Sequence, residues 1–533
     1  MSQLTDREGW FTTLRRFPSD FRRDSRLLAA DLAALLRRMF RTERAHTAAL
    51  LIIVLAGIAV RVAMVNRPMM DDESTTYLNF TSRPFSEALS SYGIPNNHLL
   101  NTALSRVSIL IFGNSPVVLR LPSLIAGCLT ILAGYAFARS AYSKEVALLT
   151  AALIAAASYM IDYSSVSRGY SFVSTGFMAM LALASLLRAN WNTFAAVLLA
   201  GVGALSMYAI PIAAYPLAVT FVWLGASLLL EKRGQVVGSI GRDFILSGLL
   251  TVVFTALLYL PVILRAGHLS ILQMAEPQTW NDFVGYYRYS LPLIGSLWNQ
   301  DLPDWAVYVL LAAAVIGVIF HWRMTRYAIP VVLVGFVLVP ALVIATRTVV
   351  PGERIWSFLL PLYLTAAAAG MVFVIDQARR VIPVWALQMT LLALPLLLVL
   401  IQSVRVYQHE STYVWDLDPI HRQGAEIAAI IGRDVPPYSA ILSMYGAYPA
   451  INYYQIVQAG PPGPDYVNWG AIQRIRQTPV RLYVLVVITS GQPEQRPGDI
   501  AALFKLNPDD YAEFTLIHTF DRVLLYMADR KSP

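Results

Sequence analysis

The sequence predicts a polytopic α-helical membrane protein with about eleven transmembrane helices, followed by a small extracytoplasmic α/β domain. Three observations lead to this fold class. Of the 533 residues, 56% are hydrophobic and 14% are charged, whereas soluble proteins carry about 25% charged residues. Apolar runs long enough to cross a bilayer recur between residues 46 and 401. Beyond residue 402, polar residues become more frequent and short β-like runs replace the long apolar ones.

Residues 1–45 form a basic segment that we expect on the cytoplasmic side. Ten arginines fall in residues 1–46, which indicates a membrane-facing cytoplasmic end rather than a nucleic-acid-binding region. Within 22–44 the arginines alternate with apolar residues at helical spacing, so this stretch is either an interfacial helix or a disordered tail. The segment is too long and too charged for a cleavable signal peptide. The single cysteine, Cys128, excludes a disulfide within the chain.

The apolar runs have the length of about 20 residues that a transmembrane helix needs. We predict spans at 46–65, 117–138, 145–163, 170–188, 192–208, 210–230, 244–264, 304–321, 327–345, 356–375 and 381–401. The predicted inner links are all basic and hold Arg139 and Lys144, Arg188, Lys232, Arg233 and Arg242, Arg323 and Arg326, and Arg379 and Arg380. This alternation predicts a multi-pass membrane protein with its N-terminus in the cytoplasm and its C-terminus outside.

The transmembrane domain is therefore expected over 46–401, and its first outer loop, 66–116, contains two weakly amphipathic stretches. Residues 402–533 are expected to form the extracytoplasmic α/β domain, which has an ordinary domain size. We predict its strands at 438–445, 481–489, 514–520 and 522–528, and its helices at 419–432 and 498–506.

Three consecutive acids, Asp71-Asp72-Glu73, follow the first predicted span. Carboxylates cannot enter hydrocarbon without a large cost, and neighbouring carboxylates repel one another. One explanation is a solvated helix cap, because acidic residues are favoured in the first turn of a helix. The other is a general base at the membrane surface, which would take a proton from a hydroxyl that attacks a lipid-borne substrate.

Further polar residues collect in the predicted outer segments. They include Asn97, His98, Asp162, Arg168, Tyr170, Arg288, Arg347 and Arg354. Arginines can hold a phosphate bidentately, and Arg168 and Arg354 adjoin long apolar runs, at the depth of a lipid phosphate. Each also has a structural explanation, since an arginine can extend from a helix end to the interface, His98 can be a satisfied polar residue, and Asp162 can cap a helix.

The sequence indicates no dedicated cofactor. No cluster of His, Asp and Cys has metal-site spacing, although a divalent metal stays open. No glycine-rich loop could cradle a nucleotide phosphate, so a nucleotide is not expected as the direct donor.

Four segments in order resemble the GT-C glycosyltransferases over about residues 46–400, most closely the protein O-mannosyltransferase and aminoarabinose-transferase-like branch. The segments are Met-Met-Asp71-Asp72-Glu73-Ser-Thr-Thr, Asn96-Asn97-His98-Leu-Leu-Asn with Phe112-Gly113 and Arg120-Leu-Pro122, Tyr163-Ser-Ser-Val-Ser-Arg168-Gly-Tyr170, and Gly352-Glu353-Arg354-Ile-Trp356-Ser-Phe-Leu-Leu-Pro361. The chain departs from the branch where Asn-Asn-His98-Leu-Leu replaces the usual His-Pro-Pro-Leu-Tyr, and where Asp71 precedes the Asp-Glu pair. These departures put donor specificity and the identity of the base in doubt.

The resemblance implies an enzyme of the plasma (bacterial inner) membrane, with a polyprenyl-phosphate-sugar donor and a glycan, lipid or protein acceptor, and without a soluble cofactor. Asp72 would be the base, oriented by Glu73 or Asp71, and one displacement would invert the anomeric carbon. Arg354 and Arg168, with Arg347 or Arg288, would stabilise the leaving phosphate. Two other function classes stay open: a lipid or glycan transporter, which would need polar residues distributed through its spans, and a non-catalytic glycan-binding member of the fold.

Overall fold

The computed structural model describes residues 2–92, 96–231, 239–266, 277–325, 327–347, 353–378, 382–408, 419–436, 439–443, 448–459, 465–468, 479–488 and 496–531. The chain divides into two compact units, which are described separately. Unit 1 comprises Met1–Val65, Leu89–Leu104 and Arg120–Gln408, and unit 2 comprises Asn66–Ala88, Ser105–Leu119 and His409–Pro533.

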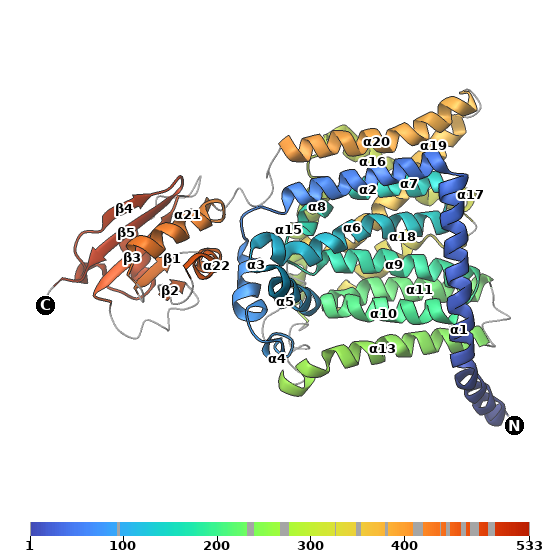
Figure 1. Ribbon diagram of the computed structural model, residues 1–533, viewed down its shortest axis with the longest axis horizontal. Coiled ribbons are helices and arrows are strands. Elements are labelled where there is room, and N and C mark those ends of the chain that lie inside the picture. The colour runs from blue at the N-terminus through green and yellow to red at the C-terminus, as the bar shows by residue number, and fades with distance from the viewer. Residues whose placement is uncertain are drawn as a thin grey trace. The chain divides into compact units, whose positions relative to one another are not determined.

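Unit 1 is a bundle of long, roughly parallel helices (Figure 1). Every one of the eleven predicted spans overlaps helix. The helices are α2 (Arg44–Met64), α6 (Pro116–Ala141), α7 (Lys144–Ala156) with α8 (Ser158–Ser164), α9 (Tyr170–Ala189), α10 (Thr193–Ala209), α11 (Ala214–Glu231), α13 (Ser239–Ala266), α16 (Asp304–Ile319), α18 (Val331–Thr346), α19 (Leu360–Gln377) and α20 (Val384–Gln408). Helix α15 (Trp280–Trp298) lies between α13 and α16 in the sequence, in a loop predicted to be outer, and the 3-10 turn η4 (Glu353–Leu359) leads into α19.

Not all of these helices are long enough to cross a membrane by length and composition. Among the described residues seven qualify, or eight if α7 and α8 together form one span. The apolar helices α10, α16 and α18 have 17, 16 and 16 residues, and about 20 residues are needed to cross the hydrocarbon core without tilt or thinning. The chain is thus a multi-helix membrane protein, and eleven crossings remain a prediction.

Small residues allow one pair of helices, α16 and α19, to approach backbone to backbone. A Cβ atom added to Gly370 would overlap the Ala313 carbonyl oxygen, and one added to Gly317 would overlap the Ala366 carbonyl oxygen. Both helices therefore carry a small residue, three intervening residues and a second small residue at the crossing. This spacing favours close helix packing inside a membrane, where dispersion rather than the hydrophobic effect drives association.

The predicted span 145–163 is broken in the structure, because α7 and α8 meet at an angle of 63°. Ala157 has an extended backbone at the break, so the last carbonyl groups of α7 lack their usual helical partners. Arg61 of α2, which is fully buried, donates to the carbonyl oxygens of Ile154 (3.1 Å) and Ala155 (3.0 Å). It also donates to the Ser164 hydroxyl at the end of α8 (3.2 Å). One buried side chain thus connects both halves of the broken helix.

The basic N-terminal segment is helical rather than disordered. Helix α1 (Ser2–Arg41) crosses the ends of the bundle helices in Figure 1. Asp24 of α1 accepts a hydrogen bond from the backbone amide of Thr193 (2.7 Å) at the start of α10. Glu43, just after α1, pairs with Arg139 (2.7 Å). Helix α1 therefore packs on the end of unit 1 that carries links predicted to be cytoplasmic.

Unit 2 contains a five-stranded mixed sheet in the order β2-β1-β3-β5-β4. Its elements are α21 (Pro419–Asp434), β1 (Ala440–Ser443), α22 (Tyr448–Ala459), β2 (Asp465–Asn468), β3 (Arg481–Val487), α23 (Pro497–Leu503), β4 (Thr515–Thr519) and β5 (Val523–Asp529). Strand β1 is parallel to β2 and β3, whereas β5 is antiparallel to β3 and β4. The four predicted strands and two predicted helices all appear, and α22 and β2 are additional.

The central strand β3 is buried on both faces, which explains its nearly continuous apolar sequence. Tyr483 and Leu485 face a core that includes residues of α21 and α22. Val484 and Val486 face the opposite core, which includes Ile500 of α23. Unit 2 thus has helices on both sides of one sheet.

We predict that Gly370→Ala destabilises the protein by about 1–3 kcal/mol, the usual cost of overpacking, because its methyl group would overlap the Ala313 carbonyl. The matched control is Gly201→Ala, since a Cβ at this helical glycine meets no atom within 4 Å. Thermal unfolding in detergent measures both. Equal midpoints for the two variants would contradict the close α16–α19 crossing.

Candidate functional site

The acidic triplet begins a short helix in unit 2, α3 (Asp71–Thr76), which continues into a π-helical turn, η1 (Tyr77–Thr81). Glu73 is almost fully buried, and its Oε2 accepts a hydrogen bond from the backbone amide of Met70 (3.2 Å). Glu73 therefore acts as part of an N-terminal cap. Asp71 and Asp72 are half-buried. The three acids thus differ in environment, because Glu73 is buried at the cap whereas Asp71 and Asp72 are partly accessible.

Aromatic residues of α22 hold this acidic helix in place within unit 2. The backbone amide of Met69 donates to the Tyr454 hydroxyl (3.0 Å). The ring of Tyr77 meets that of Tyr453 edge to face, with 4.9 Å between centroids, and the Tyr77 hydroxyl accepts from the Asn114 amide (2.6 Å). Sequence reasoning missed this support because α22 itself was not predicted. The adjacent tyrosines Tyr453 and Tyr454 were the sequence feature that could have indicated this contact.

A second polar cluster, in unit 1, centres on His98 and Arg168, and we call it the His98–Arg168 cluster. Both side chains are buried. His98 Nδ1 accepts a hydrogen bond from the backbone amide of Gly169 (2.7 Å), and His98 Nε2 lies 3.3 Å from Arg168 Nη2. Arg168 Nη1 also donates to the Asn96 carbonyl (3.1 Å). Residues 96–98 and 168–169, distant in sequence, are therefore joined by hydrogen bonds.

The hydrogen bond from Gly169 determines the form of His98. Because Nδ1 accepts a hydrogen bond, a neutral ring must carry its proton on Nε2. Burial, and then the positive charges of Arg168 and Arg354, hold the pKa of His98 well below its usual value, so the ring is neutral at physiological pH. The Nε2–H and the Arg168 guanidinium are then two donors side by side. Such a pair is suited to an oxyanion placed against both.

Small polar residues position the backbone of Arg168. Ser123 of α6 donates to the Arg168 carbonyl (2.8 Å) and accepts from the Arg168 amide (3.2 Å). Asn101 donates to the Ser167 hydroxyl (3.0 Å), and its Oδ1 lies 2.9 Å from the Ser123 hydroxyl oxygen. The next residue must be small, because a Cβ at Gly169 would lie 2.8 Å from Ile210 Cγ1 and 3.2 Å from His98 Nδ1. Sequence reasoning missed the contribution of Asn101 and Ser123 to the position of Arg168. The available signal was that each is a polar residue within an apolar helix.

Tyr170 and Asp162 lie around this cluster. The Tyr170 ring meets His98 (5.3 Å between centroids) and Tyr163 (5.1 Å) edge to face, and the Arg168 guanidinium lies 5.9 Å from the Tyr170 centroid. Asp162 is buried in α8, six residues before Arg168. Tyr170 is therefore part of the cluster, and Asp162 belongs to the helix that leads into it.

The remaining predicted residues are distributed more widely. Arg354, in η4, is half-buried, and its charge contributes to the low pKa of His98. Arg347 has a left-handed backbone after α18, and its guanidinium lies 5.9 Å from the Trp280 ring centroid. Arg288 is exposed on α15. The Asn97 amide donates to the Ser91 carbonyl (2.7 Å) and accepts from the Thr102 hydroxyl (2.8 Å). Asn97 therefore stabilises the conformation of its own loop.

In the described part of the chain, no group of three His, Cys, Asp or Glu side chains could hold a metal ion. The His98–Arg168 cluster presents donors of hydrogen bonds rather than the anionic oxygens that hard cations need. It can therefore bind an anion.

We predict that the stabilising contribution of neutral His98 decreases as the pH falls below about 6.5, the ordinary pKa of histidine. The unfolded chain takes up this proton near that pH, whereas folded His98 does not, so acid favours unfolding. Thermal midpoints of the wild type and His98→Gln, measured from pH 8 to pH 5, should converge toward the acid end. A difference that widens on acidification would contradict a neutral, buried His98.

Comparisons with known proteins agree with this arrangement of helices. Residues 99–247 match the family model described as dolichyl-phosphate-mannose-protein mannosyltransferase, and no curated protein matches the chain in sequence. Crystal structures of ArnT from Cupriavidus metallidurans, apo and bound to undecaprenyl phosphate, are 13% identical. Each match covers 90% of this chain. The apo structure is covered over 98% of its own chain with a TM-score of 0.58, and the lipid-bound structure over 97% with a TM-score of 0.56.

The oligosaccharyltransferase of Archaeoglobus fulgidus, tethered to an acceptor peptide, is 14% identical over 92% of this chain and 74% of its own, with a TM-score of 0.54. At these identities the structural likeness establishes the fold. The chain therefore resembles ArnT and the oligosaccharyltransferase in fold, and over residues 99–247 it resembles the protein mannosyltransferases in sequence.

Proposed function

We propose that the protein is a membrane glycosyltransferase that moves one sugar from a polyprenyl-phosphate donor to an acceptor hydroxyl on the extracytoplasmic face. The observation that carries the proposal is the His98–Arg168 cluster, in which a neutral imidazole N–H and a buried guanidinium lie side by side. An imidazole N–H and a guanidinium that lie side by side can both donate hydrogen bonds to one oxyanion, so the cluster favours an anionic ligand such as a phosphate.

The lipid phosphate is the leaving group in this reaction. It departs as an anion, and donors fixed beforehand stabilise the charge that develops on its oxygens. Arg168 would contact the phosphate together with His98, and Arg354 would add a second guanidinium from η4. Arg347 or Arg288 could assist, although Arg347 already contacts Trp280. Because the lipid-phosphate bond supplies the energy, the reaction needs no soluble cofactor.

The acceptor hydroxyl must lose a proton as it attacks the anomeric carbon. Asp72 is the proposed base, because Glu73 caps α3 through its bond to the Met70 amide and can hold the helix start in position. Asp71 is the alternative base. A single displacement by the hydroxyl, with the phosphate leaving from the opposite side, would invert the anomeric configuration.

The relatives support the donor and acceptor classes in general terms. ArnT of Cupriavidus metallidurans has been solved with undecaprenyl phosphate, and the oligosaccharyltransferase of Archaeoglobus fulgidus with an acceptor peptide. We carry over a prenyl phosphate as the donor lipid and leave the sugar and the acceptor unspecified.

The proposed membrane orientation is N-terminus inside and C-terminus outside, with 402–533 as an extracytoplasmic domain. The basic helix α1 contacts the links beside Thr193 and Arg139, which the charge pattern assigns to the cytoplasm. A transporter is the main alternative function. The buried Arg61 is not evidence for it, since it bonds backbone carbonyls and a serine inside the bundle.

We predict that Asp72→Asn lowers transfer by about a hundredfold to ten-thousandfold, the usual effect of losing a general base, while thermal stability stays near that of the wild type. Transfer of a radiolabelled sugar from prenyl phosphate measures the effect. If Asp71→Asn is inactive and Asp72→Asn is active, the general base is Asp71 instead of Asp72. If both keep full activity, the acid–base mechanism is wrong.

We also predict that Arg354→Lys weakens transfer and that Arg354→Ala weakens both transfer and binding of a prenyl-phosphate analogue. A lysine supplies a charge but not the bidentate fork of a guanidinium. Arg323→Ala is the control, because Arg323 is exposed on a link predicted to be cytoplasmic. If Arg354→Ala binds the analogue with unchanged affinity, Arg354 does not contact the phosphate, and Arg168 is the better candidate for the phosphate ligand.

A further inference from the structure

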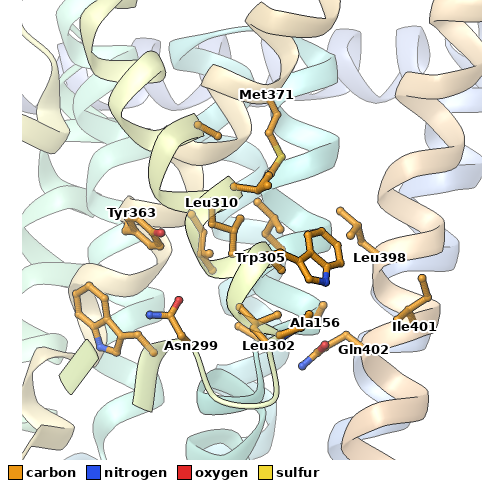
Figure 2. Close-up of a pocket in the computed structure, with 18 of the residues that line it drawn as sticks. Ala156, Asn299, Leu302, Trp305, Leu310, Tyr363, Met371, Leu398, Ile401 and Gln402 are labelled. Atoms are coloured by element: carbon orange, nitrogen blue, oxygen red, sulfur yellow. The ribbon is translucent and has the colours of Figure 1, made fainter. Parts of the chain in front are cut away.

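A cavity of about 650 Å³ lies in unit 1 between helices α16 and α20, with α7 and α19 behind it. This is within the size range of about 300–1,000 Å³ for small-molecule sites. Figure 2 shows its apolar body, to which Leu310, Met371 and Leu398 contribute from α16, α19 and α20. Trp305 of α16 lines the cavity and is largely exposed, so the cavity opens at the surface of the helix bundle.

One end of this cavity is polar. Asn299 and Gln402 lie at the end opposite Met371 in Figure 2. The Gln402 amide donates to the Ser158 hydroxyl (3.0 Å). Three other polar atoms at this end, Trp298 Nε1, Asn299 Oδ1 and Gln300 Oε1, are buried and have no hydrogen-bond partner within the described part of the chain. Buried polar groups are nearly always hydrogen-bonded in native proteins, so both a donor and two acceptors lack partners here.

The same end carries a positive charge. Arg405 of α20 is the only charged side chain that lines the cavity among the described residues. Its guanidinium donates to the Asp301 carbonyl (3.3 Å), and no described carboxylate lies within ion-pair distance of it. Arginine has five N–H donors, so most of its hydrogen-bonding capacity remains for a ligand.

We propose that this cavity binds an anionic phospholipid with a hydroxylated headgroup, of the phosphatidylglycerol type. One acyl chain would fill the apolar body toward Met371, and the phosphate would lie against Arg405. The headgroup hydroxyls would donate to the free amide oxygens of Asn299 and Gln300, and the Trp298 N–H would donate to a phosphate or ester oxygen. A zwitterionic headgroup would place an ammonium beside Arg405 and is disfavoured.

The donor lipid is a different molecule in this account. Its phosphate is assigned to the His98–Arg168 cluster, and none of His98, Arg168 and Arg354 lines the cavity. The phospholipid site and the proposed reaction are nevertheless connected through α8, because Ser158 at its start lines the cavity and its end leads to Arg168. A bound phospholipid would therefore stabilise the helix that carries the chain toward the cluster.

The test uses the full-length protein in nanodiscs of phosphatidylcholine that contain a fixed fraction of phosphatidylglycerol, of phosphatidylethanolamine, or of phosphatidylglycerol together with undecaprenyl phosphate. Native mass spectrometry of the released protein counts the retained lipid. We expect one tightly retained phosphatidylglycerol in the wild type and about tenfold less retention in Arg405→Gln, which loses the charge-assisted contact. Leu398→Trp, which fills the apolar body, should also lose it. Arg323→Gln, an arginine outside the cavity, should retain it.

Three results would overturn the proposal: equal retention in Arg405→Gln and Arg323→Gln, no preference for phosphatidylglycerol over phosphatidylethanolamine, or retention of undecaprenyl phosphate in place of phosphatidylglycerol with the same dependence on Arg405. The last result would make the cavity part of the donor site. Asp72→Asn should keep phosphatidylglycerol, so the failure of this proposal and the failure of the transferase proposal are distinguishable. The thermal midpoint of each variant in phosphatidylcholine alone reports whether it is folded.

Discussion

The arrangement of unit 1 depends on one buried cation, Arg61. Burying a guanidinium without a carboxylate is costly unless its donors are satisfied. The bent α7–α8 pair offers what is needed, because the break at Ala157 exposes the carbonyls of Ile154 and Ala155 at the negative end of the α7 dipole. The arginine and the break therefore stabilise each other, and neither would be expected alone inside a membrane helix bundle.

This constraint extends to the candidate site. Arg61 also donates to Ser164 at the end of α8, four residues before Arg168. The turn that contains Arg168 is then fixed from the other side, since Ser123 bonds both the amide and the carbonyl of Arg168. These bonds fix the backbone that carries the Arg168 guanidinium, so the charge is preorganised. A preorganised charge stabilises a developing anion without further rearrangement. The neutral His98 completes the arrangement with an N–H beside it.

The sequence predicted the helices of unit 1 and most strands of unit 2, because both follow from apolar runs and alternation. It did not predict the break at Ala157, which depends on Arg61 more than 90 residues away. It also missed α22, whose buried face is partly aromatic and polar rather than aliphatic, and with it the support for α3. Within the site, His98, Arg168 and Tyr170 were predicted to bind substrate and do lie together. The tautomer of His98 and the roles of Asn101 and Ser123 depend on contacts between distant segments, which no single sequence displays.

The central claim is that the His98–Arg168 cluster holds the phosphate of a prenyl-linked donor. Its most direct test is a cryo-electron-microscopy structure of the full-length protein with undecaprenyl phosphate. The account predicts phosphate density within hydrogen-bond distance of His98 Nε2 and the Arg168 guanidinium, with Arg405 contacting a different molecule or none. Phosphate density against Arg405, with the His98–Arg168 pair unoccupied at saturating lipid, would contradict it.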